Sequence, residues 1–453
     1  MHSFDRRSRR LSWRVLAYAL RRIRMDPPLD HAETEETLRA RAGRTITEHG
    51  LGGSETLRIW RDVLAPACIS VDHPRFFSYV PAAPTEAAGL FDVAVSAANV
   101  YAGSWQEGAG AVFAENETLR WLADLAGLPS GAGGVFVSGG TAGNLSALVA
   151  ARWRWRRDGT GQRDATRALI VASRSAHSSG AQSARVMDAD VAVVDVDDRG
   201  RMDGEGVREA VARLSVVDRE RICAVVATAG STNAGIVDDL AGLGAVAREI
   251  GAWFHVDGAY GAAALCAPSR RHLFDGIEMA DSFIVDPHKW LFAPFDSCAL
   301  VYRDPTVARA AHSQHAEYLE VLHERNEWNP SDYAHHLSRR PRGLPLWFSL
   351  ATHGTAAYTD AVETTLRVTD EAADLIRQAP HVELVIEPEL SVLLFRRIGW
   401  NASDMNAWSD RVLAEGLAFI VPTSWKGESC LRLCIVNPET TAADVALVLE
   451  SLR

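Results

Sequence analysis

A lysine stands directly after an apolar run in the segment Asp281–Trp290, which reads DSFIVDPHKW. Of the 47 basic residues in the chain only two are lysines, Lys289 in this segment and Lys426 in the short polar stretch SWKG. A lysine amine can form a Schiff base with a carbonyl group, and we expect burial to lower the pKa of that amine. Lys289 is therefore the candidate for amine chemistry, with an ordinary surface lysine as the alternative, whereas Lys426 is typical of a turn.

A glycine-rich turn follows another apolar run, in the sequence VSGGTAGN from Val137 to Asn144. Backbone N–H groups at the start of a helix, together with the hydroxyl of Thr141, can hold an anion such as a phosphate. The segment has neither the lysine of a Walker A loop nor the G-x-G-x-x-G spacing of dinucleotide-binding turns. On this motif alone, a phosphate site and a turn without a ligand both remain open.

An aspartate and a histidine also come at the ends of apolar runs. Asp257 ends the run in AWFHVDGAYG, and a buried carboxylate there needs a cation or good hydrogen-bond donors. The alternative is an aspartate that caps the next helix. His177, in SAHSS, could stack on a planar ring or hydrogen-bond a substrate, and a structural role is its alternative.

The elements that position these residues follow from the pattern after about Val135. Short runs of Val, Ile and Ala alternate with amphipathic stretches, which predicts a mostly parallel sheet covered by helices on both faces. Ligands of such sheets bind at the carboxyl ends of the strands, where the four candidate segments lie. After Leu346, a helix-rich stretch and the runs ELVIEP, SVLLFRR and CLRLCIVNP predict a smaller α+β domain.

Two segments fall outside this alternation. Residues 6–24 are basic and partly apolar like a secretion signal, but Arg14 interrupts the apolar run and no small-residue cleavage site follows. We expect a docked helix or a basic arm there. Residues 304–345 are rich in His, Arg, Tyr and Trp, and so long a polar segment in an enzyme-sized chain indicates a lid.

Composition excludes several classes of protein. A chain of 453 residues with 47% apolar and 23% charged residues predicts two or three globular domains. The net charge of -11 argues against nucleic-acid binding. Six cysteines without a C-x-x-C pair favour a reducing cytoplasm over a disulfide framework or a zinc module, and no apolar run is long enough to span a membrane.

Taken together and in this order, the motifs resemble the group II pyridoxal 5'-phosphate (PLP) amino-acid decarboxylases. This family includes the aromatic-L-amino-acid, histidine and glutamate decarboxylases. The resemblance covers nearly the whole chain, and the pair HVDGAYG and DPHKW is its most specific part. It also includes HPRFFSYVP at 73–81, SWQ at 104–106, TAGST at 228–232 and LRL at 431–433.

The resemblance implies a type I PLP-dependent transferase fold, with a large, mostly parallel seven-stranded sheet and a smaller C-terminal α+β domain. We divide the chain into an N-terminal helical arm for dimerisation at 1–85, a PLP-binding domain at 86–345 and a small domain at 346–453. The implied cofactor is PLP, no metal is implied, and the implied partners are an amino-acid substrate and a second copy of the chain.

The resemblance also implies residue roles. Lys289 would form the Schiff base with PLP, and Asp257 would pair with the protonated pyridine nitrogen. His177 and Ala259 would lie on the two faces of the ring. The phosphate cradle would include Gly140 and Thr141, with Ser231 and His288 close to the cofactor. The substrate site would be formed by Tyr79, Pro81, Ala82, Trp105 and Arg432, with Arg432 helping to hold the substrate carboxylate. Asp286 stands where several relatives have Asn, and an ionised Asp cannot donate a hydrogen bond to the phosphate.

The expected reaction is decarboxylation of an L-amino acid to its amine and CO2. Tyr333, in PSDYAHH, matches the mobile-loop tyrosine proposed as the acid in aromatic decarboxylases, whereas some aldehyde-forming relatives carry Phe there. Tyr79, Tyr101 and Trp105 suggest an apolar or aromatic pocket, which favours an aromatic substrate over a branched aliphatic one. Decarboxylative oxidative deamination, transamination and a PLP-binding protein without turnover are the alternatives.

Overall fold

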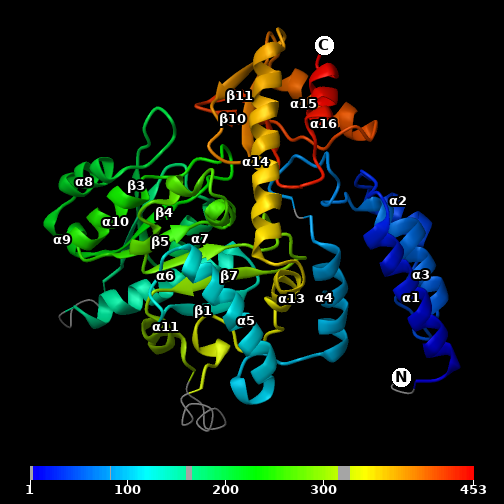
Figure 1. The fold of residues 1–453 in the computed structure, drawn as a ribbon, viewed down its shortest axis with the longest axis horizontal. Helices are drawn as coiled ribbons and strands as arrows, with labels where there is room; N and C mark the ends of the chain where they lie inside the picture. The colour runs from blue at the N-terminus through cyan, green and yellow to red at the C-terminus, as the bar shows by residue number, and fades with distance from the viewer. Residues whose placement is uncertain (1–3, 82, 160–165, 315–326) are drawn as a thin grey trace.

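The structure is a computed structural model of the chain and describes residues 4–81, 83–159, 166–314 and 327–453. It contains a seven-stranded sheet and a four-stranded sheet, and the long helix α14 (Thr355–Gln378) runs from the first toward the second (Figure 1). No helix in these ranges is both long enough and apolar enough to cross a bilayer.

The large sheet has the strand order β1-β7-β6-β5-β4-β2-β3. Strands β3, β2, β4, β5 and β6 are parallel, and β7 pairs antiparallel with both β6 and β1. This confirms the predicted mostly parallel sheet of seven strands. The strands are β1 (Gly133–Val137), β2 (Leu169–Ser173), β3 (Asp190–Val194), β4 (Ile222–Thr228), β5 (Trp253–Asp257), β6 (Ser282–Val285) and β7 (Cys298–Tyr302).

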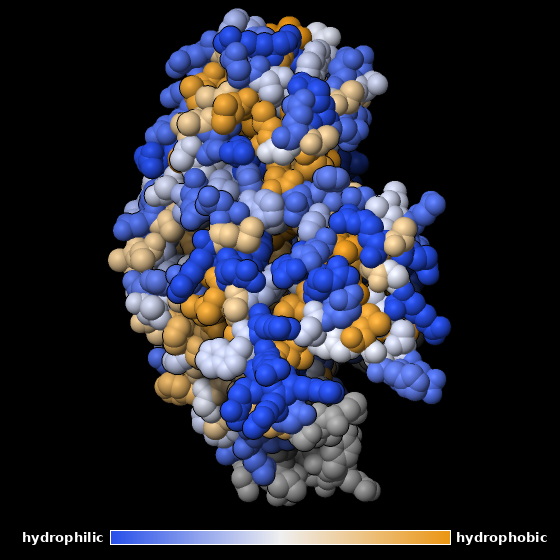
Figure 2. Space-filling model, turned by 90° about the vertical axis from the view of Figure 1, so that its right-hand side faces the viewer, coloured by the Kyte–Doolittle hydropathy of each residue, from blue (hydrophilic) through white to orange (hydrophobic). Residues whose placement is uncertain are grey.

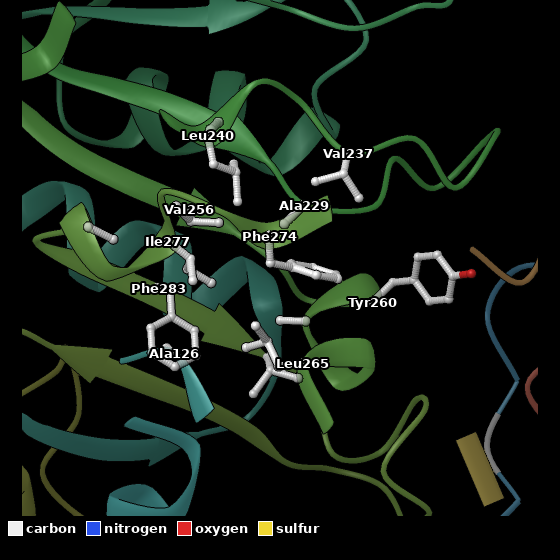
Figure 3. Packing of buried hydrophobic residues seen from close by; sticks show 14 of the residues in the cluster. Ala126, Ala229, Val237, Leu240, Val256, Tyr260, Leu265, Phe274, Ile277 and Phe283 are labelled. Atoms are coloured by element: carbon white, nitrogen blue, oxygen red, sulfur yellow. The ribbon is translucent and has the colours of Figure 1, made fainter. Parts of the chain in front are cut away.

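Both faces of this sheet are buried, because successive strand residues point to opposite sides. Val225 packs into one hydrophobic cluster with residues of α5, α8 and α10, and its neighbour Val226 packs into another with residues of α6, α7 and α11. Figure 3 shows the first cluster, in which Val256 and Phe283 from the sheet meet Leu240, Phe274 and Ile277. The helices are α5 (Trp105–Leu125), α6 (Gly140–Arg157), α7 (Ser178–Val186), α8 (Gly204–Arg213), α9 (Val216–Glu220), α10 (Leu240–Glu249) and α11 (Pro305–His312).

The small domain carries the antiparallel sheet, in the order β10-β11-β9-β8. Its own hydrophobic cluster joins the sheet to α14, α15 and α16, which confirms the predicted smaller α+β domain. Tyr260, at the end of the large sheet, points out toward this domain (Figure 3), and its hydroxyl lies 2.5 Å from Oγ of Ser391. The elements are α13 (Leu344–His353), β8 (Val382–Ile386), β9 (Val392–Arg397), α15 (Ala402–Ala414), β10 (Thr423–Trp425), β11 (Glu428–Cys434) and α16 (Ala442–Glu450).

The N-terminal segment forms an arm of helices at one side of the molecule (Figure 1). Within it, α1 has no buried residue, and Asp5 caps its first turn. After the arm the chain docks on the small domain, where Phe77 donates to the carbonyl of Phe419 and accepts from Cys434. The helices of the arm are α1 (Arg6–Arg24), α2 (Glu35–Ala42) and α3 (Gly53–Ile59), and α4 (Glu86–Ala98) follows the docked segment and packs against α13.

The segment expected as a lid is packed into the large domain over the part that the structure describes after residue 326. The guanidinium of Arg339 is buried and makes two 2.7 Å hydrogen bonds to the carboxylate of Glu115, which also accepts from the backbone of Gly343. Removing one partner of such a buried ion pair strongly destabilises the folded protein, because the other charge stays buried without a partner. These contacts hold residues 339–343 in place.

Candidate functional site

A cavity of about 410 Å³ opens at the carboxyl ends of the central strands. It contains Lys289, Asp257 and His177, which come from three separate segments of the sequence. The sheet order explains this convergence, because β2, β4, β5 and β6 are neighbours and parallel. The cavity is lined by Ser138, Gly139, Gly140, Thr141, Ala142, Asn144, His177, Ser179, Thr228, Gly230, Thr232, Asp257, Ala259, Tyr260, Asp286, His288, Lys289, Phe295 and Asp296.

Lys289 follows β6, and its Nζ lies 2.9 Å from Oδ2 of Asp286, which is buried. Burial lowers the pKa of Lys289, but the charge of Asp286 and its hydrogen bond outweigh burial, so the pKa lies above its usual value. The expected lowering of the lysine pKa by burial is therefore wrong for this arrangement. The carboxylate of Asp286, three residues before Lys289, reverses the effect of burial.

Asp257 is the last residue of β5 and is held by two donors. Nδ2 of Asn144 donates to its Oδ2 at 2.8 Å, and the backbone N–H of Ala259 donates to its Oδ1 at 3.2 Å. These two donors fix the carboxylate of Asp257 as a hydrogen-bond acceptor at the edge of the cavity.

His177 precedes α7 and lines the cavity together with Ala259. Its Nδ1 accepts from the backbone N–H of Ser179 and lies 2.8 Å from the Ser179 hydroxyl. These contacts fix the orientation of the imidazole ring.

The glycine-rich turn between β1 and α6 approaches the other strand ends closely. A Cβ placed on Gly140 would lie 3.1 Å from Cβ of Ala259 and 3.2 Å from Oδ2 of Asp286. These distances are tighter than ordinary contacts, so a side chain here would crowd the cavity. The backbone N–H of Gly140 lies 3.3 Å from Oδ2 of Asp286, which is therefore shared between the turn and Lys289.

Two further residues predicted near the cofactor differ in position. His288 lines the cavity, accepts from the backbone N–H of Ser297 and packs against the Phe295 ring at 4.8 Å. Burial lowers the pKa of His288, although Asp286 acts in the opposite direction. Ser231 is not in the lining: its Oγ accepts from the backbone of Ile236, and its two neighbours in the chain reach the cavity instead.

Of the residues predicted to hold the substrate, the four that the structure describes do not line this cavity. Tyr79 is 64% exposed, with a left-handed backbone (φ 54°), and Pro81 is buried. The backbone of Trp105 begins α5 and donates to Asn329. Arg432 is buried and donates to the carbonyl of Thr232, which does line the cavity. Ala82 lies outside the described residues.

Tyr333, the predicted acid, is packed in the hydrophobic cluster on the α6 face of the large sheet. Its ring is 4% exposed and stacks on Trp328 with centroids 4.2 Å apart. Burial raises the pKa of Tyr333 to about 12. Its catalytic role stays a prediction, and that role requires the ring to leave this cluster.

The sequence reasoning missed several residues of the cavity. Asn144 closes the glycine motif and Phe295 follows Lys289 by six residues, but no local pattern marks either as functional. Thr228 and Thr232 bracket a motif that was identified, and both line the cavity. The Oγ1 of Thr228 is buried without a hydrogen-bond partner in the part of the chain that the structure describes.

Residues 46–398 match the model of the pyridoxal-dependent decarboxylase conserved domain. The chain belongs to the pyridoxal-dependent decarboxylase family. It is 28% identical over 438 residues to an aromatic-L-amino-acid decarboxylase of Bacillus atrophaeus, covering 94% of this chain and 90% of the relative. It is also 26% identical to an L-2,4-diaminobutyrate decarboxylase of Acinetobacter baumannii, covering 90% and 84%.

Solved structures share the fold of this decarboxylase. The Oryza sativa TDC with PLP and tryptamine superposes with a TM-score of 0.91 at 24% identity, over 100% of this chain and 98% of that one. A Catharanthus roseus tryptophan decarboxylase in complex with L-tryptophan gives a TM-score of 0.87 at 21% identity, over 99% and 97%. These likenesses confirm the predicted fold class.

PLP is the cofactor of this decarboxylase family, and the residues around the cavity fit it. The lysine amine suits the aldehyde of PLP, and the carboxylate of Asp257, held by donors, suits the pyridine nitrogen. The glycine turn, which a side chain would crowd, suits the phosphate. The buried hydroxyl of Thr228 is a further polar group at this wall. No cluster of His, Cys, Asp or Glu within the described ranges is arranged to hold a metal ion.

Proposed function

We propose that this decarboxylase converts an aromatic L-amino acid to its amine and CO2. The observation that carries the proposal is the convergence of Lys289, Asp257 and His177 on one cavity at the strand ends. The aromatic preference is supported by Phe295 at that cavity and by the aromatic-L-amino-acid decarboxylases among its relatives.

The charges around the cavity favour an aromatic side chain over a cationic one. A substrate such as 2,4-diaminobutyrate carries a distal ammonium group that needs a free carboxylate. Asp286 is paired with Lys289, and Asp296 accepts from Arg342 at 2.9 Å. Both carboxylates already have cationic partners, which weakens the case for a diamino acid.

Within this proposal, each residue acts on a stated group. Lys289 binds the cofactor carbonyl, and Asp257 holds the proton on the pyridine nitrogen. His177 and Ala259 would pack against the cofactor ring, and the turn at Gly140 and Thr141 would hold the phosphate. The bound cofactor supplies a ring that accepts the electron pair of the broken Cα–carboxylate bond.

The cavity walls must also exclude water and deliver a proton to Cα. His288 and Phe295 close one side, and Ser231 and Arg432 support the wall from behind through the 230–232 segment. A substrate carboxylate held by Arg432 would lie beside the carbonyl of Thr232, which Arg432 already contacts. We propose this carboxylate role for Arg432 and the proton-donor role for Tyr333.

Oxygen-dependent aldehyde formation is the second candidate. Among the described lining residues Tyr260 is the one tyrosine, and its hydroxyl is bonded to Ser391, so no phenol is poised over the cavity. A phenylacetaldehyde synthase of a Rosa hybrid cultivar is 28% identical over 358 residues, covering 76% of this chain and 70% of the relative. Both observations favour testing this reaction beside simple decarboxylation.

We also propose a homodimer that completes the substrate site. The arm exposes a row of apolar residues on α1, with Trp13 70% exposed, and the side of the molecule that carries the arm has apolar surface between polar patches (Figure 2). The exposed Tyr79 follows helix α3 in the chain, so a second copy seated on the arm could bring such residues to the cavity. The exposed apolar residues of α1 are Trp13, Val15, Leu16 and Leu20.

The proposed compartment is the cytoplasm, and the support for it is chemical. All six cysteines are free, and five of them are buried. Burial raises the pKa of Cys223 and of Cys266 to about 12, which keeps these thiols protonated and unreactive.

The deciding experiment measures CO2 release and organic product for each of the twenty amino acids, with and without oxygen. We expect CO2 from tryptophan, phenylalanine or tyrosine, with the amine as product. Aldehyde and hydrogen peroxide in air would establish the second candidate. A cofactor absorbance band that responds to no amino acid would establish a binding protein without turnover.

A further inference from the structure

Asn144 is buried in the wall of the cavity and uses both of its amide hydrogens there. Its Nδ2 donates to Oδ2 of Asp257 at 2.8 Å and to Oγ of Ser179 at 2.9 Å. A carboxylate only accepts hydrogen bonds, so the amide cannot be turned around without facing its oxygen to Asp257. The Oδ1 of Asn144 therefore points away from Asp257 and must accept.

The group that donates to Asn144 Oδ1 is Nε2 of His255, 2.8 Å away. Nδ1 of the same ring lies 2.8 Å from Oγ of Ser282, and this oxygen accepts from the indole N–H of Trp253 at 2.8 Å. An indole N–H can only donate, so the hydroxyl hydrogen of Ser282 is left to point at His255.

His255 is therefore a neutral ring with its hydrogen on Nε2. Its side chain is fully buried, and burial lowers the pKa of His255 to about 4 despite the charge of Asp257. Every hydrogen bond in this series of side chains then runs in one direction, from donor to acceptor. It starts at Trp253, passes through Ser282 and His255, and ends at Asn144.

At Asn144 the chain divides toward two residues of the cavity. One branch ends on the carboxylate of Asp257. On the other branch, Ser179 accepts from Asn144 and so turns its hydroxyl hydrogen to Nδ1 of His177. Since Nδ1 already accepts from the backbone of Ser179, His177 carries its hydrogen on Nε2, at the opposite edge of the ring.

We propose that Asn144 is a positioning residue that carries this one-way hydrogen-bond chain from Trp253 to the two side chains facing the cofactor ring, Asp257 and His177. The proposal rests on the cofactor-binding roles proposed above, and it adds a reason for the buried polar residues of β5 and β6. Because every hydrogen of the chain has one place, Asp257 and His177 are preorganised before the cofactor arrives.

The first test uses the whole chain, freed of PLP and labelled with 15N-histidine. The nitrogen chemical shifts report which ring nitrogen carries hydrogen, and His177 is assigned from its loss in His177→Gln and His255 from its loss in His255→Gln. We expect the Nε2–H form at both residues at pH 7. An Nδ1–H form or a charged ring at His255 would overturn the direction of the chain.

The second test measures binding of pyridoxine 5'-phosphate, which has no aldehyde and cannot condense with Lys289. Asn144→Asp places an acceptor where both branches need a donor, and we expect binding to weaken at least about tenfold. In the same variant the new carboxylate should stabilise the protonated form of His255 and draw the hydroxyl hydrogen of Ser179 away from His177, which shifts the Nδ1 signal of His177. Asn437→Asp is the control, because Asn437 is equally buried and lies outside the cavity lining.

Unchanged binding and an unchanged His177 signal in Asn144→Asp would overturn the proposal. If that variant does not fold, Ser282→Ala and Ser282→Thr decide instead. Loss of the hydroxyl should shift the Nδ1 signal of His255 and weaken binding severalfold, and threonine should restore both. Equal behaviour of the two variants would overturn the proposal. Neither test requires turnover, so a failed decarboxylase assay would count against the proposed function alone.

Discussion

The floor of the cavity, where Lys289 and Asp257 lie, and the region around the N-terminal arm differ in how their side chains are buried and paired. On the floor, Asp257 is buried and the side chain of Lys289 is 24% exposed, and each has a partner within 3 Å. Around the arm, Tyr79 and Trp13 are largely exposed and reach no part of the cavity. One chain therefore organises the cofactor half of the site, whereas the described residues predicted for the substrate half do not line the cavity, and Arg432 alone among them contacts a lining residue, Thr232.

This difference has a physical origin in the sheet. Parallel neighbours must bring their carboxyl ends to one edge, so residues that follow β2, β5 and β6 meet whatever else the chain does. The arm has no such constraint. α1 has no buried residue, and a helix with an unsatisfied apolar face gains stability from a second surface.

The largest effect is expected on the floor, from Lys289→Ala. Removing the amine should lower activity by about a thousandfold or more, because Lys426, the other lysine of the sequence, does not line the cavity. It should also abolish the visible absorbance of the lysine-bound cofactor. Lys426→Ala is the matched control, since that lysine is exposed and pairs with Asp198 at 3.4 Å.

Borohydride reduction followed by peptide mapping identifies the labelled lysine directly. A label on Lys426 would remove Lys289 from the mechanism and with it the main observation behind the proposed function.

The next effect in size is expected from Asp257→Asn. A neutral amide no longer holds the proton on the pyridine nitrogen, so turnover should fall by about a hundredfold while PLP stays bound. Equilibrium dialysis for the cofactor and steady-state rates measure the two properties separately. A near-normal kcat in a folded variant would contradict the role of Asp257.

The exposed apolar surface of the arm can be changed without altering the residues of the cavity floor. Trp13→Glu combined with Leu16→Glu puts charge into the exposed row of α1, and we expect monomers with about tenfold lower activity and unchanged absorbance of the bound cofactor. Sedimentation velocity and activity at the same protein concentration check this. Val216→Glu is the control, because Val216 is also 70% exposed and lies on α9.

A fully active monomer would refute a substrate site completed by a second copy. The exposure of Tyr79 would then have a cause other than a second copy of the chain.

These variants also show which features could be predicted from the sequence. The strand runs, the glycine turn and the order HVDGAYG then DPHKW are local patterns, and they located Lys289, Asp257 and His177 in one cavity. Asn144 could not be found this way, because its importance depends on contacts with residues more than 30 positions away. The pKa of Lys289 was expected below its usual value for a different reason, because the prediction considered burial without the carboxylate of Asp286, three residues earlier.

A smaller effect sharpens the account of the floor itself. Asp286 raises the pKa of Lys289, so Asp286→Asn should lower that pKa and leave more neutral amine at pH 7. Each unit of pKa changes the neutral fraction about tenfold. A small acylating reagent applied to the PLP-free protein should modify Lys289 faster in the variant, with Lys426 as the reference within each sample. Equal ratios at every pH would show that Asp286 does not control the amine.

The smallest effect on rate is expected from Tyr333→Phe, which removes one oxygen atom from a buried ring. If the phenol protonates Cα after CO2 has left, CO2 release should stay within about twofold, while the share of amine falls and aldehyde and hydrogen peroxide rise in air. The amine-to-aldehyde ratio of wild type and variant, with and without oxygen, measures this. The stacking of Tyr333 on Trp328 already gives the ring a structural place in the α6-side cluster. An unchanged ratio would therefore assign Tyr333 to packing alone, and the proton donor would have to come from the cavity lining, with His177 as the next candidate.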